Sequence, residues 1–392
     1  MIKLAVIFES SPFDRKGLFN AVHNRILNLL ATGECEIDAY CIHSWDTAFT
    51  RKVRKTPYIA EKPQQVVIDG IVYNMLWYDF SIIDHITVEK LCKEPLLFGR
   101  FIRRSLPLFR GYDAVLAHSL AGALMAEQVL HKYALPYFVT WHGSDIHTHS
   151  WRNRLIMDAT RRIMKGATCN FFVSKTLEKE SDKIVSGVQK EVLYNGVSED
   201  FVRFSDERRR AARIAYGLSE DEKVVAFVGS LSAVKNVDLL QPLFREIRRS
   251  YKGSLKFWVV GDGKRRQAIE PGLINEPDME VCMMGNRTTE EMPSIMNCID
   301  VLVLPSRNEG LGMVCAEAIR CGANAAGADV GGIAEVVGKE NVVPHGPDFI
   351  EGMASKVTAM LTGCVQQSCP EYLDWKATAR KEMDYIRTSL IP

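Results

Sequence analysis

Short apolar runs alternate with stretches of helical spacing along most of this chain, and this alternation narrows the possible folds more than any other feature. In the first half, β-prone runs are followed by segments whose apolar residues recur every three or four positions. The predicted strands are 3–8, 36–43, 113–117, 137–141 and 170–173, and the predicted helices are 18–30, 121–133 and 154–164. Such alternation is typical of a doubly wound α/β fold with a parallel sheet.

A second series of the same kind starts at Val224 and indicates a second α/β domain. Its predicted strands are 224–228, 255–260, 280–284 and 301–304. A length of 392 residues leaves room for two or three domains, so two doubly wound domains are expected. Such sheets bind ligands outside the carboxyl ends of their strands, and two of them would leave a cleft there. Within the first domain, Asp69-Gly70 between β-prone runs predicts a hairpin over 66–78.

The composition is that of a globular protein without an unusual charge. The formal net charge is +1, and 47% of the residues are hydrophobic, so no global attraction to nucleic acid is expected. The ten cysteines form no CxxC pair and no spaced metal framework, which predicts buried free thiols in a reducing cytoplasm. The apolar start is too short before Glu9 for a signal peptide, and no apolar run approaches a membrane span.

The stretch 301–338 carries the strongest functional pattern in the chain. A buried strand is predicted to end at Leu304, a turn with Gly310 and Gly312 follows, and helical spacing begins at about Met313. A strand that leads through a glycine turn into a helix N-terminus offers free backbone N–H groups and a favourable helix dipole. Both favour an anion, so this turn is a predicted site for a phosphate-bearing ligand.

Two acids lie on either side of this turn, Glu309 in the loop and Glu317 in the helix. Carboxylates repel a negatively charged phosphate, so Glu309 and Glu317 are expected to accept hydrogen bonds from hydroxyl groups instead. A nucleotide sugar, with a diphosphate between two polyols, would meet both demands. The alternative is that Glu309 caps the helix and Glu317 is a solvated helix residue.

These residues resemble the signature of the retaining nucleotide-sugar glycosyltransferases of the GT-B fold, glycosyltransferase family 4 (glycosyl transferases group 1). The family pattern is Pro-Ser, Glu-Gly-x-Gly, a second Glu eight positions after the first, Cys-Gly, Gly-Gly and Glu. The matching residues here are Pro305, Ser306, Glu309, Gly310, Gly312, Glu317, Cys321, Gly322, Gly331, Gly332 and Glu335. The resemblance spans nearly the whole chain and is sharpest over 224–338. It implies two Rossmann-like doubly wound domains that face a central cleft.

The resemblance also implies domain boundaries. Asn195-Gly196 is similar to the Asn-Gly linker between the two domains of the family. We therefore predict an acceptor-side domain at 1–196 and a nucleotide-sugar donor-binding domain at 197–370. The segment 371–392, with helical spacing over 372–390, is expected to cross back onto the first domain, as the corresponding helix does in the family.

For the donor, the resemblance implies that Glu309 holds sugar hydroxyls, Glu317 holds the ribose, and Lys235 neutralises the departing diphosphate. Ser230 stands where the family usually has an arginine, so the phosphate contact differs there. The predicted donor-binding residues are Gly17, Ser230, Lys235, Gly263, Asn286, Glu309, Gly310, Leu311, Gly312, Met313 and Glu317. Without the resemblance, Lys235 would be a solvated lysine, and Gly263 would belong to an ordinary strand–helix turn.

The first domain is predicted to serve the acceptor side. His142-Gly-Ser-Asp145 is similar to the family motif in which the histidine approaches the transferred sugar, and Lys16 lies in the loop after the first strand. The predicted catalytic residues are thus His142, Glu309 and Lys235. His142, His147 and His149 could instead be read as a metal cluster, but neither zinc-like spacing nor a carboxylate-rich companion motif supports that reading.

The stretch 96–112 is basic and aromatic, with Arg100, Arg103 and Arg104 among large apolar residues. Such a stretch could lie on an anionic membrane surface. The preferred interpretation is a helix that packs on the sheet with its arginines outward and ends near Pro107.

The resemblance implies transfer of a hexose-type sugar from a nucleoside diphosphate sugar to a hydroxyl of a glycan or lipid-linked acceptor, with retained configuration. No Asp-x-Asp motif occurs, so no metal or other cofactor is expected. Family habit suggests bacterial surface polysaccharide or lipopolysaccharide assembly, in the cytoplasm or on the inner face of the membrane. The alternatives are a nucleotide-sugar epimerase on the same fold and a non-catalytic nucleotide-sugar-binding subunit, the latter suggested by Ser230.

Overall fold

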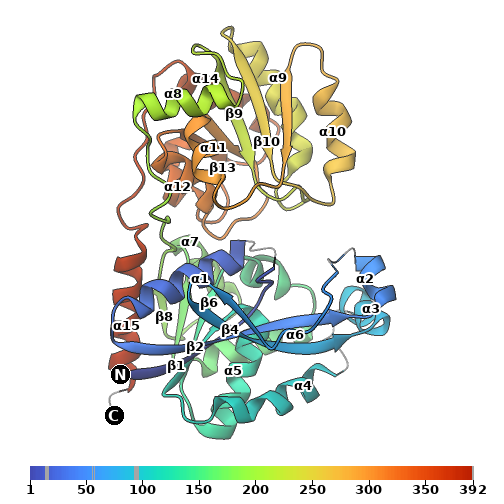
Figure 1. Cartoon of the computed structure of the whole chain (residues 1–392), viewed down its shortest axis with the longest axis vertical. Helices are drawn as coiled ribbons and strands as arrows, with labels where there is room; N and C mark the ends of the chain where they lie inside the picture. The colour runs from blue at the N-terminus through green and yellow to red at the C-terminus, as the bar shows by residue number, and fades with distance from the viewer. Residues whose placement is uncertain (14–16, 55, 57, 92–96, 391–392) are drawn as a thin grey trace. The chain divides into compact units, whose positions relative to one another are not determined.

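The computed structural model describes residues 1–13, 17–54, 56, 58–91 and 97–390. The chain forms two compact units, each with one sheet flanked by helices (Figure 1). The first unit consists of Met1–Asn195 together with Trp375–Pro392, and the second consists of Gly196–Asp374. The predicted α/β class with two parallel-sheet, Rossmann-like domains is confirmed.

The first unit contains an eight-stranded sheet in the order β3-β4-β2-β1-β5-β6-β7-β8. The strands are β1 Ile2–Glu9, β2 Cys35–Asp46, β3 Gln65–Ile68, β4 Ile71–Phe80, β5 Ala114–His118, β6 Tyr137–Trp141, β7 Cys169–Phe172 and β8 Lys190–Val192. Neighbouring strands are parallel except β3 and β4, which form the predicted hairpin. Its turn places Asp69 and Gly70 at φ of 49° and 80°, a conformation that suits this residue pair.

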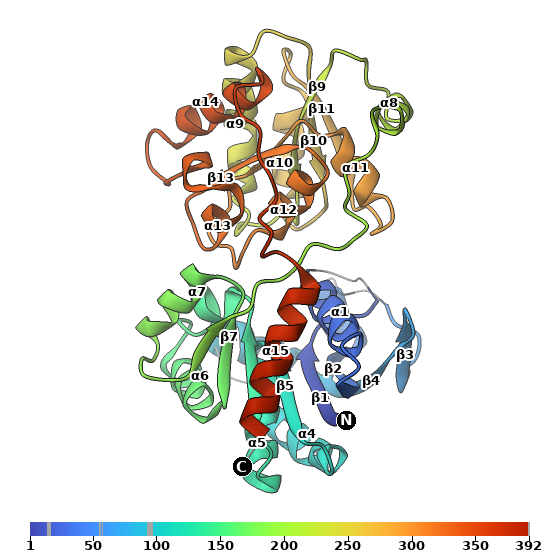
Figure 2. The ribbon, with the colours of Figure 1, turned by 90° about the vertical axis from the view of Figure 1, so that its left-hand side faces the viewer.

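Helices cover both faces of this sheet. They are α1 Gly17–Leu30, α2 Ala48–Arg54, α3 Ile82–Leu91, α4 Phe98–Ser105, α5 Ser119–Tyr133, α6 Arg154–Gly166, α7 Lys175–Glu180 and α15 Trp375–Leu390. The C-terminal helix α15 lies beside α1 (Figures 1 and 2). Its Met383 and Ile386 join a core formed by β1 and by Phe19 and Ile26 of α1. The helix begins three residues later than Tyr372, because a turn from Pro370 to Leu373 precedes it.

The second unit contains a six-stranded parallel sheet in the order β11-β10-β9-β12-β13-β14. The strands are β9 Lys223–Val228, β10 Leu255–Val260, β11 Glu280–Gly285, β12 Val301–Leu304, β13 Asn324–Ala328 and β14 Val342–Val343. The helices are α8 Asp206–Ala215, α9 Leu240–Ser250, α10 Arg266–Ile274, α11 Met292–Cys298, α12 Met313–Arg320, α13 Ile333–Val337 and α14 Phe349–Leu361. The four strands predicted for this half are therefore confirmed, and α12 begins at Met313 as expected.

Each sheet has one point where the strand order reverses. In the second unit the chain proceeds from β9 to β10 and β11 on one side, and from β12 to β13 and β14 on the other. In the first unit the same reversal lies between β1 and β5. Loops at the carboxyl ends of strands beside such a reversal turn away from each other and leave room for a ligand. A ligand-binding site is therefore expected at the loops after β1, β5, β9 and β12.

The basic stretch forms a packed helix with its arginines outward. Phe98 and Ile102 of α4 are buried, whereas Arg100, Arg103 and Arg104 are exposed, and a 3₁₀ turn, Leu106–Phe109, follows. The preferred packing interpretation is confirmed for 97–112, and residue 96 lies outside the described residues. Among the helices that the structure describes, none has the length and apolar character needed to cross a membrane.

The described cysteines are all free thiols. Six of the nine are buried, as the sequence predicts. Cys282 and Cys364 are exposed, so the expectation that these thiols are buried is wrong for them.

Candidate functional site

The loops after β9 and β12 meet where the second sheet reverses its strand order. The ammonium group of Lys235 forms an ion pair with the carboxylate of Glu309, and Ser306 Oγ donates a hydrogen bond of 2.8 Å to Glu309 Oε1. The backbone N–H of Arg307 donates to the carbonyl of Val234 at 2.8 Å, which ties the two loops together. Glu309 therefore interacts with residues of both loops.

Two further side chains support this arrangement. Asn236 adopts a left-handed conformation with φ of 54°, which asparagine tolerates better than most residues, and its Oδ1 accepts a hydrogen bond of 3.0 Å from Arg307 Nε. His345 Nε2 lies 2.9 Å from the carbonyl oxygen of Ser306. The sequence analysis missed both Asn236 and His345. The position of Asn236 directly after Lys235 was an available signal, whereas nothing local to His345 pointed to this loop.

The glycine turn is held by close backbone packing. The residue before α12 is Gly312, with φ of 82°, and the N–H of Gly332 donates to the carbonyl of Gly310 at 3.2 Å. A Cβ on Gly331 would lie 1.8 Å from the carbonyl oxygen of Glu309, so no side chain fits there. The Gly331-Gly332 turn thus packs directly on the loop that carries Glu309. The intervening Leu311 is buried and Met313, at the start of α12, is half-buried.

Glu317 differs from an ordinary solvated helix residue. It is half-buried on α12. Its carboxylate accepts no hydrogen bond from any of the described residues, which are all residues except 14–16, 55, 57, 92–96 and 391–392. Burial raises the pKa of the Glu317 carboxyl from 4.5 to about 7. A carboxylate in this state gains from a hydroxyl donor, because a hydrogen bond to the charged form offsets the loss of solvation.

We expect Glu317→Gln to stabilise the free protein at pH 8 and to change it little at pH 5. Since the folded pKa is raised, the folded state holds a proton that the unfolded chain releases, and stability falls as pH rises from 4.5 to about 7. The full cost reaches about 3 kcal/mol at 1.36 kcal/mol per pKa unit, and partial exposure reduces it. Thermal unfolding at both pH values measures the difference. An equal shift at pH 5 and pH 8 would contradict it.

Glycines at the ends of the adjacent strands β9, β10 and β11 bring the neighbouring backbones together. Gly229 donates to Val260 at 2.9 Å, and Gly261 donates to Gly285 at 2.8 Å. A Cβ on Gly263 would lie 2.4 Å from the carbonyl oxygen of Leu231, so backbone packing alone requires glycine there. Ser230 and Asn286, also predicted donor-binding residues, are exposed beyond these strand ends. Ser230 Oγ lies 3.3 Å from Ser232 Oγ.

In the first unit, the His-Gly-Ser-Asp motif follows β6. His142 Nε2 lies 3.0 Å from Nδ1 of His118, a residue that the sequence analysis missed although it directly follows the predicted strand 113–117. Asp145 is buried and accepts a 3.4 Å hydrogen bond from the N–H of Leu120, and burial raises the pKa of its carboxyl. Two further site residues were predicted in this unit. Gly17, predicted to bind the donor, begins α1, and Lys16, predicted for the acceptor side, lies outside the described residues.

The histidines after this motif have separate partners. His147 Nδ1 lies 2.8 Å from Glu180 Oε2, and His149 Nδ1 lies 3.9 Å from Asp145 Oδ1. Within the described part of the chain, no three His, Cys, Asp or Glu side chains converge as metal ligands would. The alternative reading of His142, His147 and His149 as one metal cluster is therefore without geometric support.

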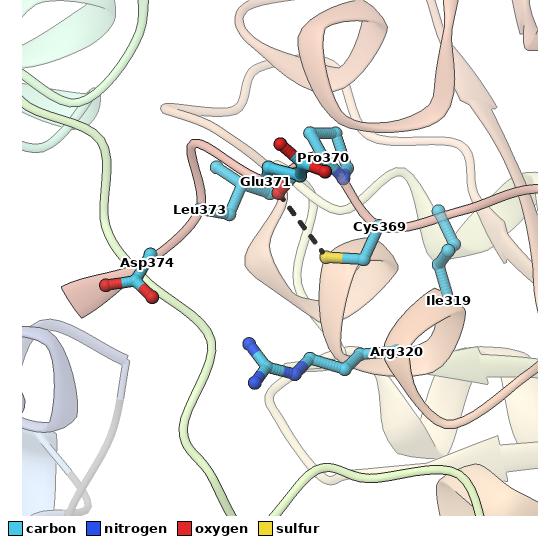
Figure 3. A pocket seen from close by; sticks show the side chains of 7 residues that line it. All are labelled: Ile319, Arg320, Cys369, Pro370, Glu371, Leu373 and Asp374. Atoms are coloured by element: carbon cyan, nitrogen blue, oxygen red, sulfur yellow. Dashed lines mark hydrogen bonds between the residues drawn. The ribbon is translucent and has the colours of Figure 1, made fainter. Parts of the chain in front are cut away.

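A separate cavity of about 460 Å³ lies at the far end of α12 from Gly312 (Figure 3). It is lined by Ile319, Arg320, Cys369, Pro370, Glu371, Leu373 and Asp374. Ile319 and Arg320 lie in the last turn of α12, and neither Lys235 nor Glu309 is among the residues that line this cavity.

Part of the chain matches a known family. Residues 208–380 match the sequence model of the family described as Glycosyl transferases group 1. The chain is 29% identical over 247 residues to an uncharacterized glycosyltransferase of Methanocaldococcus jannaschii, a match that covers 58% of this chain and 59% of that relative. It is 32% identical over 154 residues to D-inositol 3-phosphate glycosyltransferase of Mycobacterium tuberculosis H37Ra, covering 36% of this chain and 30% of the relative. The matches thus span at most about three fifths of these relatives.

Solved structures share the fold over the full length. Sucrose-phosphate synthase from Thermosynechococcus elongatus superimposes with a TM-score of 0.70 at 15% identity, covering 100% of this chain and 95% of the other. HepE of Anabaena, in complex with UDP and glucose, gives a TM-score of 0.63 at 15% identity, covering 98% and 97%. At such identities the likeness establishes the GT-B fold of two parallel-sheet domains and does not define the reaction.

Proposed function

We propose that the chain is a retaining glycosyltransferase that moves a sugar from a nucleoside diphosphate sugar to a hydroxyl group. The observation that carries this proposal is the junction of the loops after β9 and β12, where Lys235, Ser306 and Glu309 form one hydrogen-bonded group beside the start of α12. The domain match over 208–380 supports the same class of reaction.

In this proposal the second unit holds the donor. Lys235 exchanges its contact with Glu309 for the diphosphate, which the N-terminus of α12 also attracts. The released Glu309 carboxylate then accepts hydrogen bonds from the donor sugar. Glu317, which lacks a hydrogen-bond donor among the described residues, accepts from the ribose hydroxyls. The proposed reaction needs no divalent cation, because Lys235 and the backbone N–H groups stabilise the negative charge of the leaving diphosphate.

The first unit serves the acceptor through His142 and Asp145 in this proposal. The acceptor class is a glycan or lipid-linked hydroxyl, and the setting is surface polysaccharide or lipopolysaccharide assembly. One structural neighbour, a lipopolysaccharide outer core galactosyltransferase, WaaB, matches with a TM-score of 0.60 and supports this setting as an analogy. The outward arginines of α4, with exposed Leu97 and Leu108 beside them, are the surface that would lie against an anionic membrane.

A donor screen tests the proposal. The protein is incubated with UDP-, GDP-, ADP- and TDP-sugars, and thermal stabilisation and release of the nucleoside diphosphate are both measured. We expect one base to stabilise the protein, and we expect slow donor hydrolysis with that base alone. Lys235→Met should weaken binding of that diphosphate by about 10- to 150-fold, since a charge-assisted hydrogen bond contributes about 1.5–3 kcal/mol.

Two outcomes of the screen would favour the alternatives. Interconversion of a donor sugar without nucleotide release indicates an epimerase. Donor binding without any turnover across a panel of acceptors indicates a non-catalytic binding subunit. An unchanged diphosphate affinity in Lys235→Met would place Lys235 outside the site.

A further inference from the structure

The pairing of β5 with β6 in the first unit places a second histidine against His142. His118 is the last residue of β5, which pairs with β1 on one side and β6 on the other. The side chain is 1% exposed, and its Nδ1 lies 3.0 Å from Nε2 of His142, with the ring centroids 5.3 Å apart. One nitrogen of His142 is therefore engaged inside the protein.

The surroundings keep both rings neutral. Arg25 of α1 is 1% exposed, and its Nη1 donates a 2.8 Å hydrogen bond to Oγ1 of Thr140, the residue paired with His118 across the sheet. Burial, reinforced by the charge of Arg25, lowers the pKa of His142 to about 3. Burial, the His142 ring and Arg25 lower the pKa of His118 well below 6.5. Two neutral imidazoles in contact share a single hydrogen, so the tautomer of one ring fixes that of the other.

The backbone around His118 is held firmly. The next residue, Ser119, adopts φ of 66°, an unusual conformation for a residue with a side chain, and its Oγ is buried without a hydrogen-bond partner among the described residues. Three residues on, a Cβ at Gly122 would lie 2.4 Å from the carbonyl oxygen of Ile7, so α5 packs directly on β1. This packing holds the end of β5 in place and, with it, the ring of His118.

We propose that His118 is a positioning residue that occupies Nε2 of His142, so that His142 presents Nδ1 to the hydroxyl groups of the acceptor or the transferred sugar. This inference rests on the proposed function, because it assigns His142 to the acceptor side. It specifies which ring atom acts and which buried residue fixes its protonation. His118 itself touches no substrate.

Three variants at position 118 test the assignment. In His118→Asn the amide group lies close to the position of Nδ1 and can replace the contact, whereas His118→Gln places it farther out and His118→Leu removes it. We expect His118→Asn to keep kcat within about threefold, and the other two to lose about 10- to 100-fold with the donor KM unchanged. His131→Asn on the exposed side of α5 is the matched control and should transfer at the wild-type rate.

A second readout needs no substrate. The ¹⁵N chemical shifts of the His142 ring should report one fixed tautomer in the wild-type protein and in His118→Asn, and a mixture of tautomers in His118→Gln. Because this signal is read on the free protein, it tests the contact even if the proposed function fails. Unchanged His142 ring signals in His118→Gln would overturn the proposal, as would equal kcat values for His118→Asn and His118→Gln. If His118→Leu does not fold, the Asn and Gln pair still decides.

Discussion

Replacing Glu309 with glutamine should reduce sugar transfer by about 100-fold or more, while the affinity for the nucleoside diphosphate is kept or increased. In the free protein Glu309 neutralises Lys235, so glutamine releases the ammonium group for the diphosphate. Glutamine also removes the negative charge that is proposed to accept hydrogen bonds from the donor sugar. Calorimetry with the diphosphate and initial rates at saturating donor separate the two effects.

Glu351→Gln is the matched control for this variant, because it removes an exposed acid from α14 of the same unit. It should change neither the diphosphate affinity nor the rate of transfer. Loss of diphosphate affinity in Glu309→Gln, together with a normal rate at saturation, would assign Glu309 to the phosphate and contradict the proposed division of roles.

The second large effect concerns stability. Arg25 of α1 and Glu382 of α15 form an ion pair with 2.9 Å between Nε and Oε2, and each side chain is 1% exposed. We expect Glu382→Leu to destabilise the first unit by about 3–5 kcal/mol, because it leaves the Arg25 charge buried without a counterion. The double variant Arg25→Met with Glu382→Leu should recover most of that loss, since apolar side chains of similar size can replace a buried pair.

Tryptophan fluorescence during urea unfolding measures this effect, because five of the six tryptophans lie in the first unit and only Trp258 lies in the second. Lys381→Leu, which removes an exposed charge from the neighbouring position of α15, is the control and should cost less than about 1 kcal/mol. A double variant as unstable as Glu382→Leu alone would contradict this account, because it would show that the loss of stability does not come from an uncompensated Arg25 charge.

Much of the fold follows from periodicity. The apolar runs at Tyr137–Trp141 and Val301–Leu304 are strands with the predicted bounds, because buried parallel strands are apolar along their whole length. The burial of Arg25 and Glu382 could be predicted from the sequence, since both lie within the apolar stripes of their helices. Their pairing could not be predicted, because it depends on how two helices at opposite ends of the chain pack together.

The candidate site was predicted less completely. The sequence patterns predicted Lys235 and Glu309 as site residues separately. Their contact depends on β9 and β12 being neighbours in the sheet, which no local pattern specifies. Gly263 was predicted as a donor-binding residue, and the structure gives it a packing role at Leu231 that does not need a ligand. His118 was missed because a polar residue at the end of an apolar strand is common, and only the sheet brings it to His142.

One measurement tests the central claim most directly, which is that the chain transfers a sugar from a nucleoside diphosphate sugar. The donor found in the screen, labelled with ¹³C at the anomeric carbon, is followed by NMR in the presence of hydroxyl acceptors. We predict that the diphosphate is released as a new glycoside forms with the anomeric configuration of the donor. A labelled donor that is only interconverted, or that stays bound and unchanged with every acceptor, would contradict the account.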